Sequence, residues 1–364
     1  MAAGIIATAA GAGWSVHDGL FLAAIVAGGG LLWSTRDRKA WLVAAPIMLV
    51  GLVWSSLDVN GCSVGSKIRL FYEKLAGHLP YVSWSDVRAK AFSTACYASF
   101  ERRPDLEASI RHLGENTVGG RKCELYQTSL GKFWIPAPGK GLLTWLIWEI
   151  AIQQDYESGE VVIRPGDNVI DCGAHVGVFT RYALSRGAGR VIAIEPEPTN
   201  TAVLEENFAA EIASGRVTLI KAGVWDRKDV ITLSDSEDNS ARHSFVSDAP
   251  GRSKEQSIPV LPLDDIVAQL PLDRVDFIKM DIEGAERRAL AGARQIIARF
   301  KPKMAICTYH LRDDTTAIPA VVRNAQPQYQ LHAKDVETGL DRFVTKVVFF
   351  HHPPEGKSTA SAMQ

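Results

Sequence analysis

The chain has 364 residues, of which 46% are hydrophobic and 22% are charged, and its formal net charge is −1. This composition suits a globular protein with two domains, or with one large domain and an extension. The near-neutral charge excludes a general electrostatic surface for nucleic acid, so we expect no nucleic-acid partner. The cysteines are odd in number and form no C-x-x-C pair, which predicts reduced thiols rather than disulfides or zinc ligands. They are Cys62, Cys96, Cys123, Cys172 and Cys307.

Two apolar runs near the N-terminus predict a membrane-associated helical hairpin. Residues 19–33 and 40–57 carry no charge, and the charged segment 36–39 separates them. Each run is slightly shorter than the roughly 20 residues that span a bilayer, so a shallow re-entrant hairpin or buried helices of a soluble domain are the alternatives. Basic residues flank the second run on both sides, and the positive-inside rule therefore does not fix the topology. We expect membrane association through residues 19–57.

Four regions are expected along the chain. They are a hydrophobic hairpin at 1–60, a mixed region at 61–140, a large α/β domain at 141–352 and a disordered tail at 353–364. The mixed region is predicted to contain helices over 69–79 and 85–99 and short strands over 123–127 and 132–135.

An apolar amphipathic segment opens the α/β domain at residues 142–154. Its length favours a core or lid helix over a further membrane span. Glu149 within it would be costly to bury alone. An exposed helix edge is the common explanation for such a residue, and a functional polar partner is the alternative.

The most informative stretch is Val169-Ile-Asp-Cys-Gly-Ala-His-Val-Gly177. It predicts a buried strand, a glycine turn and the start of a helix. A second buried strand over 191–194 ends at Glu195. An acid at this distance from the glycines can accept hydrogen bonds from both hydroxyls of a ribose. The pattern therefore predicts a pocket for a nucleotide-like cofactor.

The spacing of the glycines distinguishes two classes of cofactor. A dinucleotide site requires G-x-G-x-x-G, whereas this loop has Gly173-x-x-x-Gly177 with Asp171 just before it. A carboxylate would repel a pyrophosphate but favours the ammonium and sulfonium of S-adenosylmethionine. We therefore predict an S-adenosylmethionine site. An NAD-dependent enzyme and an ordinary βα turn without a ligand are the alternatives.

From residue 166 onward, strands and helices alternate regularly, which predicts a parallel, doubly wound sheet. The predicted strands are 169–171, 191–194, 216–220, 274–280, 303–308, 328–333 and 343–350, with an added hairpin of 230–233 and 258–261, and the helices are 176–184, 200–213, 264–269 and a helix ending at 300. In such sheets, ligands bind at the carboxyl ends of the strands. Asp171, Glu195, Asp281 and His310 all fall at such ends.

Four ordered motifs carry a resemblance to a known family. They are Val169-Ile-Asp-Cys-Gly-Ala-His-Val-Gly-Val-Phe179, Glu195-Pro196 with Asn200, Leu263-Asp264-x-Ile266, and Ile278-Lys-Met-Asp-Ile-Glu-Gly-Ala-Glu286. Together they resemble the FkbM family of S-adenosylmethionine-dependent methyltransferases, over roughly residues 130 to 330. The last motif is the most specific. The N-terminal hairpin lies outside the resemblance.

The resemblance implies a class I methyltransferase (Rossmann-like) fold, in which a seven-stranded sheet is parallel except for its last strand. It also implies the cofactor-binding residues. These are Asp171, Gly173, Ala174 and Gly177 on the methionine side, Glu195 and Pro196 at the ribose, and Val224 and Asp226 near the adenine. His175 stands where the family usually has a small polar residue. Its imidazole either bonds the cofactor or only shapes the turn.

The expected reaction is O-methylation. The sulfonium is already a good electrophile, so the enzyme mainly aligns the reactants and deprotonates the acceptor hydroxyl. His310 is the first candidate for this base because its ordinary pKa is near neutral. Asp281 is the second candidate, and it is also placed to cap a helix.

No metal site is predicted, because the sequence has no motif with metal-ligand spacing. Asp281, Glu283 and His310 could nevertheless offer ligands to a divalent ion. The expected acceptor is a small molecule, glycan or lipid, and the catalytic domain is expected at the cytoplasmic face of a membrane. A membrane-anchored binding module without catalytic activity is the alternative from another class.

Overall fold

The computed structural model describes residues 64–87, 104–235, 243–244, 255–334, 336–338 and 343–353. The predicted hairpin and nearly all of the predicted tail lie outside these residues. Among the described residues, no helix combines the length and apolar character needed to cross a membrane. The chain divides into two compact units, residues 1–101 with 336–344 and residues 102–335 with 345–364.

The helix predicted over 69–79 is present in the first unit, but it both begins and ends earlier than expected, at residues 64 and 75. The Lys74 ammonium donates to the carbonyl of Leu79 just after this helix ends, at 2.9 Å. Most of the helix predicted over 85–99 lies outside the described residues. The elements described here are α4 (Val64–Leu75) and the paired strands β14 (Val336–Thr338) and β15 (Phe343–Thr345).

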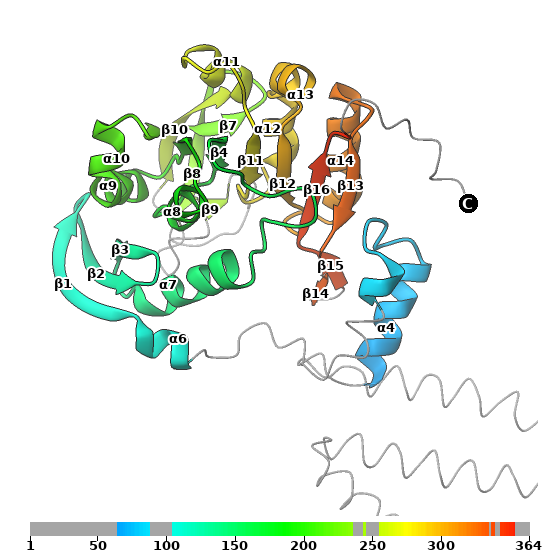
Figure 1. Ribbon diagram of the computed structural model, residues 1–364, viewed down its shortest axis with the longest axis horizontal. Helices are drawn as coiled ribbons and strands as arrows, with labels where there is room; N and C mark the ends of the chain where they lie inside the picture. The colour runs from blue at the N-terminus through cyan, green and yellow to red at the C-terminus, as the bar shows by residue number, and fades with distance from the viewer. Residues whose placement is uncertain are drawn as a thin grey trace, which may run out of the picture. The chain divides into compact units, whose positions relative to one another are not determined.

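A seven-stranded sheet lies at the centre of the second unit, with the strand order β13-β16-β12-β11-β4-β5-β6 (Figure 1). Neighbouring strands from β12 to β6 are parallel, whereas β16 is antiparallel to both of its neighbours. The predicted α/β class with an antiparallel last strand is therefore confirmed. The strands are β4 (Asn168–Cys172), β5 (Arg190–Ile194), β6 (Val217–Ile220), β11 (Phe277–Met280), β12 (Lys303–Cys307), β13 (Gln330–Ala333) and β16 (Val347–His351).

The central strands are buried almost throughout, as their apolar sequences predict. Every residue of β11 is buried, and in β4 and β5 only the first residue is partly exposed. Two charged residues nevertheless lie in this core. Asp171 on β4 and Lys279 on β11 are register partners, and they are 0% and 4% exposed. Burying two charges side by side is costly unless they are paired, so their contacts are central to the site.

The helix predicted after strand four is two helices, because the chain turns at Gly292. A Cβ atom at Gly292 would lie 2.1 Å from the carbonyl oxygen of Trp225, so only glycine permits this approach. The Asp264 carboxylate then accepts hydrogen bonds from the amides of Gln295 and Ile296 and caps the second helix. The helices are α8 (Val178–Ser185), α9 (Pro198–Asn207), α10 (Ala209–Ala213), α11 (Leu263–Ala268), α12 (Glu286–Ala291), α13 (Arg294–Phe300) and α14 (Asp314–Ala325).

A second sheet, of order β7-β10-β8-β9, belongs to the same unit. Its antiparallel pair of β8 and β10 confirms the hairpin predicted over 230–233 and 258–261. β7 adds to β10 in parallel and thereby joins this sheet to the chain that leaves β6. The strands are β7 (Gly223–Trp225), β8 (Asp229–Asp235), β9 (His243–Ser244) and β10 (Glu255–Pro262).

A three-stranded antiparallel sheet, β1-β2-β3, precedes the main sheet. β2 and β3 confirm two predicted strands, whereas β1 is not predicted. Asn207 of α9 exchanges hydrogen bonds with the backbone of Trp134 and also donates to the Val176 carbonyl, which fixes this sheet beside the start of α8. The elements are α6 (Pro104–Ser109), β1 (Arg111–Val118), β2 (Arg121–Thr128), β3 (Gly131–Pro136), α7 (Lys140–Ile147) and the π-helical turn η1 (Trp148–Ile152).

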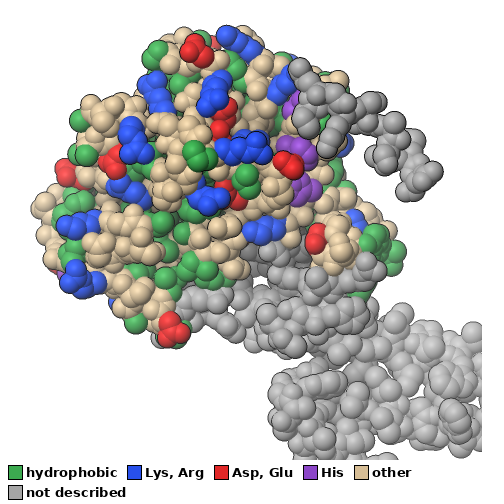
Figure 2. All heavy atoms as spheres, viewed as in Figure 1, with side chains coloured by type: hydrophobic (Ala, Val, Ile, Leu, Met, Phe, Trp, Pro, Cys, Tyr) green, Lys and Arg blue, Asp and Glu red, His purple; other side chains and the backbone are tan. Residues whose placement is uncertain are grey.

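The surface shown in Figure 2 has no continuous basic stripe among its described side chains. Lys and Arg side chains are scattered there between acidic and hydrophobic ones. The absence of a nucleic-acid partner stays a prediction.

Candidate active site at the carboxyl ends of the strands

The loop after β4 is packed so closely that two of its residues must be glycine. Gly173 and Gly177 have φ angles of +80° and +91°. A Cβ atom at Gly173 would lie 2.0 Å from the backbone oxygen of Asp281, and one at Gly177 would lie 2.2 Å from the ring of Phe208. The loop is therefore held directly against the end of β11, and the predicted cofactor loop and Asp281 are immediate neighbours.

The amides of this loop donate their hydrogen bonds within the protein. Gly173 N and Ala174 N both donate to the carbonyl of Ile194, at 3.0 and 3.1 Å, and Gly177 N donates to the Ala174 carbonyl at 2.8 Å. His175 N donates to Glu195 at 2.9 Å. A pyrophosphate site needs such amides directed at the ligand. In this loop they instead hold the ends of β4 and β5 together.

Glu195 is buried at the end of β5, where its carboxylate is fixed in place. One oxygen accepts from His175 N, and the other accepts from Glu197 N at 3.1 Å and from the Asn200 side-chain amide at 3.2 Å. Asn200 belongs to the same sequence motif as Glu195, and this hydrogen bond explains its place in the motif. A carboxylate oriented in this way can receive a further hydroxyl donor without first reorganising.

Asp171 forms a buried ion pair, which corrects its predicted role. Its side chain is 0% exposed; one oxygen accepts from the Thr180 hydroxyl at 2.7 Å, and the other lies 3.3 Å from the Lys279 ammonium. Because it is enclosed and paired, Asp171 cannot touch the charged end of a cofactor. Its negative charge is compensated inside the protein, so it gives no preference for a cationic ligand.

Lys279, on β11 beside the glycine loop, is a site residue that was not predicted from the sequence. Its ammonium donates to the carbonyls of Gly173 and Cys172, at 2.8 and 3.3 Å, in addition to its contact with Asp171. Burial lowers the pKa of Lys279, but the charge of Asp171 outweighs burial and holds that pKa above its ordinary value. Lys279 therefore stays charged and ties the glycine loop to β11. A lone lysine in an apolar strand was the available signal.

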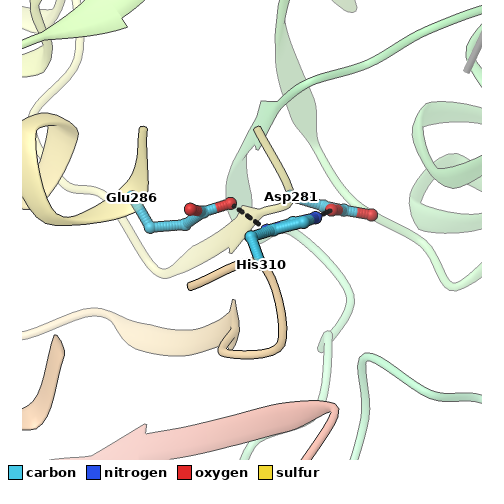
Figure 3. A group of neighbouring side chains, drawn as sticks. All are labelled: Asp281, Glu286 and His310. Atoms are coloured by element: carbon cyan, nitrogen blue, oxygen red, sulfur yellow. Dashed lines mark ion pairs between the residues drawn. The ribbon is translucent and has the colours of Figure 1, made fainter. Parts of the chain in front are cut away.

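The second group of charged residues surrounds His310, just after β12 (Figure 3). The imidazole lies between two carboxylates, with Nδ1 at 3.0 Å from Glu286 and Nε2 at 3.5 Å from Asp281. Glu283 lies 3.5 Å from the same Nε2 atom. Glu286 is fully buried and also accepts from the Ile282 amide, at 2.9 Å. The two residues predicted to be catalytic, Asp281 and His310, are thus brought together.

Two tyrosines complete the surroundings of Asp281. The hydroxyl of Tyr156 donates to Asp281 Oδ2 at 2.9 Å, and the hydroxyl of Tyr309 lies 3.4 Å from Oδ1. The side chain of Tyr156 is almost fully buried, and burial raises its pKa well above the ordinary value. Both tyrosines therefore stay protonated and act as donors to the carboxylate.

A profile of a known protein family covers the residues that form this site. The sequence profile described as "Methyltransferase FkbM domain" matches residues 171–329. Residues 171–329 therefore carry the sequence pattern of an FkbM methyltransferase domain. The matched segment begins at Asp171 and contains the loop, Glu195, Asp281 and His310.

Three similar proteins illustrate the relationship. The 31-O-demethyl-FK506 methyltransferase FkbM of Streptomyces tacrolimicus is 28% identical over 195 residues, which cover 43% of this chain and 74% of that protein. The AMB antimetabolite synthetase AmbE of Pseudomonas aeruginosa is 23% identical over 46% of this chain and 10% of its own length. The crystal structure of methyltransferase FkbM from Methylobacillus flagellatus is 25% identical with a TM-score of 0.37, covering 58% of this chain and 54% of that chain.

The protonation of the FkbM active site differs from the sequence-based expectation. Burial lowers the pKa of His310, but its contact with Glu286 outweighs burial and raises that pKa to about 9. Burial raises the pKa of Asp281, but the charges of Lys279 and His310 hold it below its ordinary value. At neutral pH the pair is an imidazolium beside a carboxylate. These charge states favour Asp281 over His310 as the member of the pair that accepts a proton, and the identity of the base stays a prediction.

The FkbM domain also contains a buried cation between two acids. Lys346 contacts Glu149 of η1 and lies 2.7 Å from Asp155, with its ammonium 5.6 Å from the centre of the Trp145 ring. Glu149 is 3% exposed and has a polar partner, so the expected exposed helix edge was wrong. A functional role for that partner stays a prediction. Burial raises the pKa of Glu149 to about 7, although Lys346 opposes the shift.

The two residues expected near the adenine, Val224 and Asp226, have different surroundings. Val224 is buried in β7 of the FkbM domain. Asp226 pairs with Arg288 of α12 at 2.8 Å and with Arg227 at 3.3 Å, so its carboxylate holds two elements together. Contact between Asp226 and the cofactor stays a prediction. At His175, the backbone has a φ of +51°, and its amide donates to Glu195 at 2.9 Å.

Proposed function

We propose that the FkbM domain transfers the methyl group of S-adenosylmethionine to a hydroxyl group of its acceptor. One observation carries the proposal: the glycine loop holds the oriented carboxylate of Glu195 on one side and the Asp281 backbone on the other. A cofactor bound to Glu195 through its ribose would lie across this loop. Its methyl group would then be presented toward the end of β11, where Asp281 lies.

The loop amides favour this cofactor over a dinucleotide. Since the amides of Gly173, Ala174, His175 and Gly177 already donate within the protein, they cannot together receive a pyrophosphate. S-adenosylmethionine carries no phosphate, and its recognition needs carboxylates and carbonyls more than amides. The sequence-based preference for this cofactor is thus kept, but on different grounds from the charge of Asp171. In this proposal Gly173, Ala174, Gly177, Glu195 and Pro196 contact the cofactor.

The chemistry assigned to Asp281 is proton removal. The acceptor oxygen attacks the methyl carbon in line, the bond between carbon and sulfur breaks, and the hydroxyl proton passes to the Asp281 carboxylate. The hydroxyl groups of Tyr156 and Tyr309 orient that carboxylate, and the imidazolium of His310 stabilises the charge beside it. The products are the methyl ether and S-adenosylhomocysteine.

The acceptor class is a hydroxyl-bearing glycan, lipid or natural-product-like molecule. The Streptomyces relative is named for methylating an O-demethyl form of FK506, which supports oxygen as the methylated atom. The aromatic side chains of Trp145 and Tyr309 are partly exposed beside the buried charges and would suit an acceptor with an apolar body.

The test is methyl transfer from isotope-labelled S-adenosylmethionine by the purified full chain, with membrane lipids, glycans and small-molecule extracts as acceptors. The wild type is expected to label one class of hydroxyl compound, and Asp281→Asn to reduce its rate by about 100-fold or more, the usual range for a lost general base. Glu205→Gln, which only removes an exposed pair with Lys221, serves as the matched control. A protein that binds the cofactor but labels nothing would support the non-catalytic binding module instead.

A further inference from the structure

The charged groups around His310 form a cluster of donor atoms that the methyl-transfer proposal does not fully use. One donor atom from each of Asp281, Glu286 and His310 lies within 4.8 Å of the others. Glu283 adds a further carboxylate, 3.5 Å from Nε2. Three carboxylates therefore converge on a single imidazole. Such an arrangement combines nitrogen and oxygen donors, which is the donor set of divalent transition metals.

The two nitrogens of His310 have different surroundings, which indicates where an ion would lie. Nδ1 is 3.0 Å from Glu286, whose carboxylate is itself fixed by the amide of Ile282. Nε2 faces Asp281 and Glu283, each at 3.5 Å. A metal-binding histidine characteristically uses one nitrogen for the ion and the other for a carboxylate that orients the ring. Glu286 is placed for the orienting role, and Nε2 for the ion.

An independent observation points to a missing partner at this position. The His310 side chain is only 8% exposed, yet neither of its ring nitrogens forms a hydrogen bond, although both lie beside carboxylates. Buried ring nitrogens are normally satisfied, so one without a hydrogen bond calls for an explanation. Glu286 Oε2 is likewise buried without a hydrogen bond. The separations of 3.5 Å around Nε2 are close to the roughly 3 to 3.5 Å expected between ligands that each lie about 2.1 Å from one ion.

We propose that His310 Nε2, Asp281 and Glu283 bind one divalent cation such as Mn²⁺ or Zn²⁺, with Glu286 orienting the imidazole. Three protein ligands leave coordination positions open to small molecules, as catalytic metal sites do. Resting on the proposed function, the ion would hold the acceptor oxygen beside the methyl group and stabilise its alkoxide. The ion would displace the proton from His310 Nε2. Asp281 would then act as a ligand in place of its role as the base, and the hydroxyl proton of the acceptor would pass to a water molecule.

Metal binding by the purified full chain tests this inference without reference to activity. The protein is stripped with a chelator, dialysed and titrated with MnCl₂ or ZnCl₂ alone in a calorimeter. One saturable site per chain is expected. Glu283→Gln should weaken it at least about 10-fold, and Glu286→Gln about 10- to 100-fold, the usual range for an orienting carboxylate. Glu205→Gln should leave it unchanged.

Glu283 is 29% exposed, so its substitution is compatible with folding even where changes at buried Glu286 are not. Absence of saturable binding of both ions, or unchanged affinity in both Glu283→Gln and His310→Gln, would overturn the metal site. Binding of S-adenosylhomocysteine is measured in the same metal-free samples. If it persists while no ion binds, the metal site fails and the methyltransferase proposal is unaffected.

Discussion

Replacing Lys279 with methionine removes the cation that holds the glycine loop to the centre of the sheet. Lys279 and Asp171 are 4% and 0% exposed, so the substitution leaves a carboxylate buried without its counter-charge. Removing one partner of a buried ion pair typically costs about 3–5 kcal/mol of unfolding free energy. The carbonyls of Cys172 and Gly173 also lose a donor, which adds about 1 kcal/mol or more. We expect a total loss of about 4–6 kcal/mol of unfolding free energy.

Chemical denaturation with a double-mutant cycle measures this loss. The double variant Lys279→Met/Asp171→Asn has no unpaired buried charge. Its unfolding free energy should therefore be about 2 kcal/mol or more higher than that of Lys279→Met alone. The carbonyls stay without their donor, and recovery should therefore be incomplete. Lys122→Met is the control, because its pair with Glu115 is exposed and is worth about 0–1 kcal/mol. A loss below about 1 kcal/mol in Lys279→Met, or strictly additive effects, would refute the reasoning.

Three further outcomes follow from particular residues. Gly173→Ala should destabilise the protein by about 2–4 kcal/mol, because the φ of Gly173 is positive and the new Cβ would meet the Asp281 backbone. Chemical denaturation measures this loss, and a value under about 0.5 kcal/mol would contradict the expectation. Burial raises the pKa of Glu149 from 4.5 to about 7, so the folded state holds this proton to higher pH than the unfolded state does. The unfolding free energy should therefore fall by about 3 kcal/mol in all as the pH rises from about 4.5 to about 7. Glu149→Gln should remove this decline in a pH series of unfolding free energies, and an unchanged slope would count against it. Asp264→Ala should cost about 1 kcal/mol through the lost cap of α13, and no change in thermal midpoint would argue against that cap.

Much of the sheet could be predicted because its central strands carry an uninterrupted apolar signal. The segments at 169–172, 190–194 and 303–307 read as buried strands in the sequence and are strands in the structure. β1 was not predicted, since most residues over 111–118 are exposed and show no alternation. The helix predicted after Asp281 was wrong in one respect, because the break at Gly292 depends on the backbone of β7.

The location of the site was predicted from the sequence, but the contacts between its residues were not. Strand ends placed Glu195, Asp281 and His310 at one edge of the sheet, and that placement follows from topology alone. The partners of these groups come from distant parts of the chain: Tyr156 meets Asp281 across 125 residues. The charge state of His310 depends on its contact with Glu286, which lies 24 positions earlier in the sequence. Sequence spacing does not carry such contacts.

Cofactor binding to the purified full chain tests the central claim most directly. In calorimetry with S-adenosylhomocysteine, the wild type should bind one ligand per chain, and NAD should give no saturable heat. Glu195→Gln should weaken binding by about 1.5–3 kcal/mol, roughly 10- to 160-fold, since an amide group cannot accept a ribose hydroxyl on both of its heteroatoms. Glu205→Gln should match the wild type. Saturable binding of NAD but not of S-adenosylhomocysteine, or unchanged affinity in Glu195→Gln, would contradict the account.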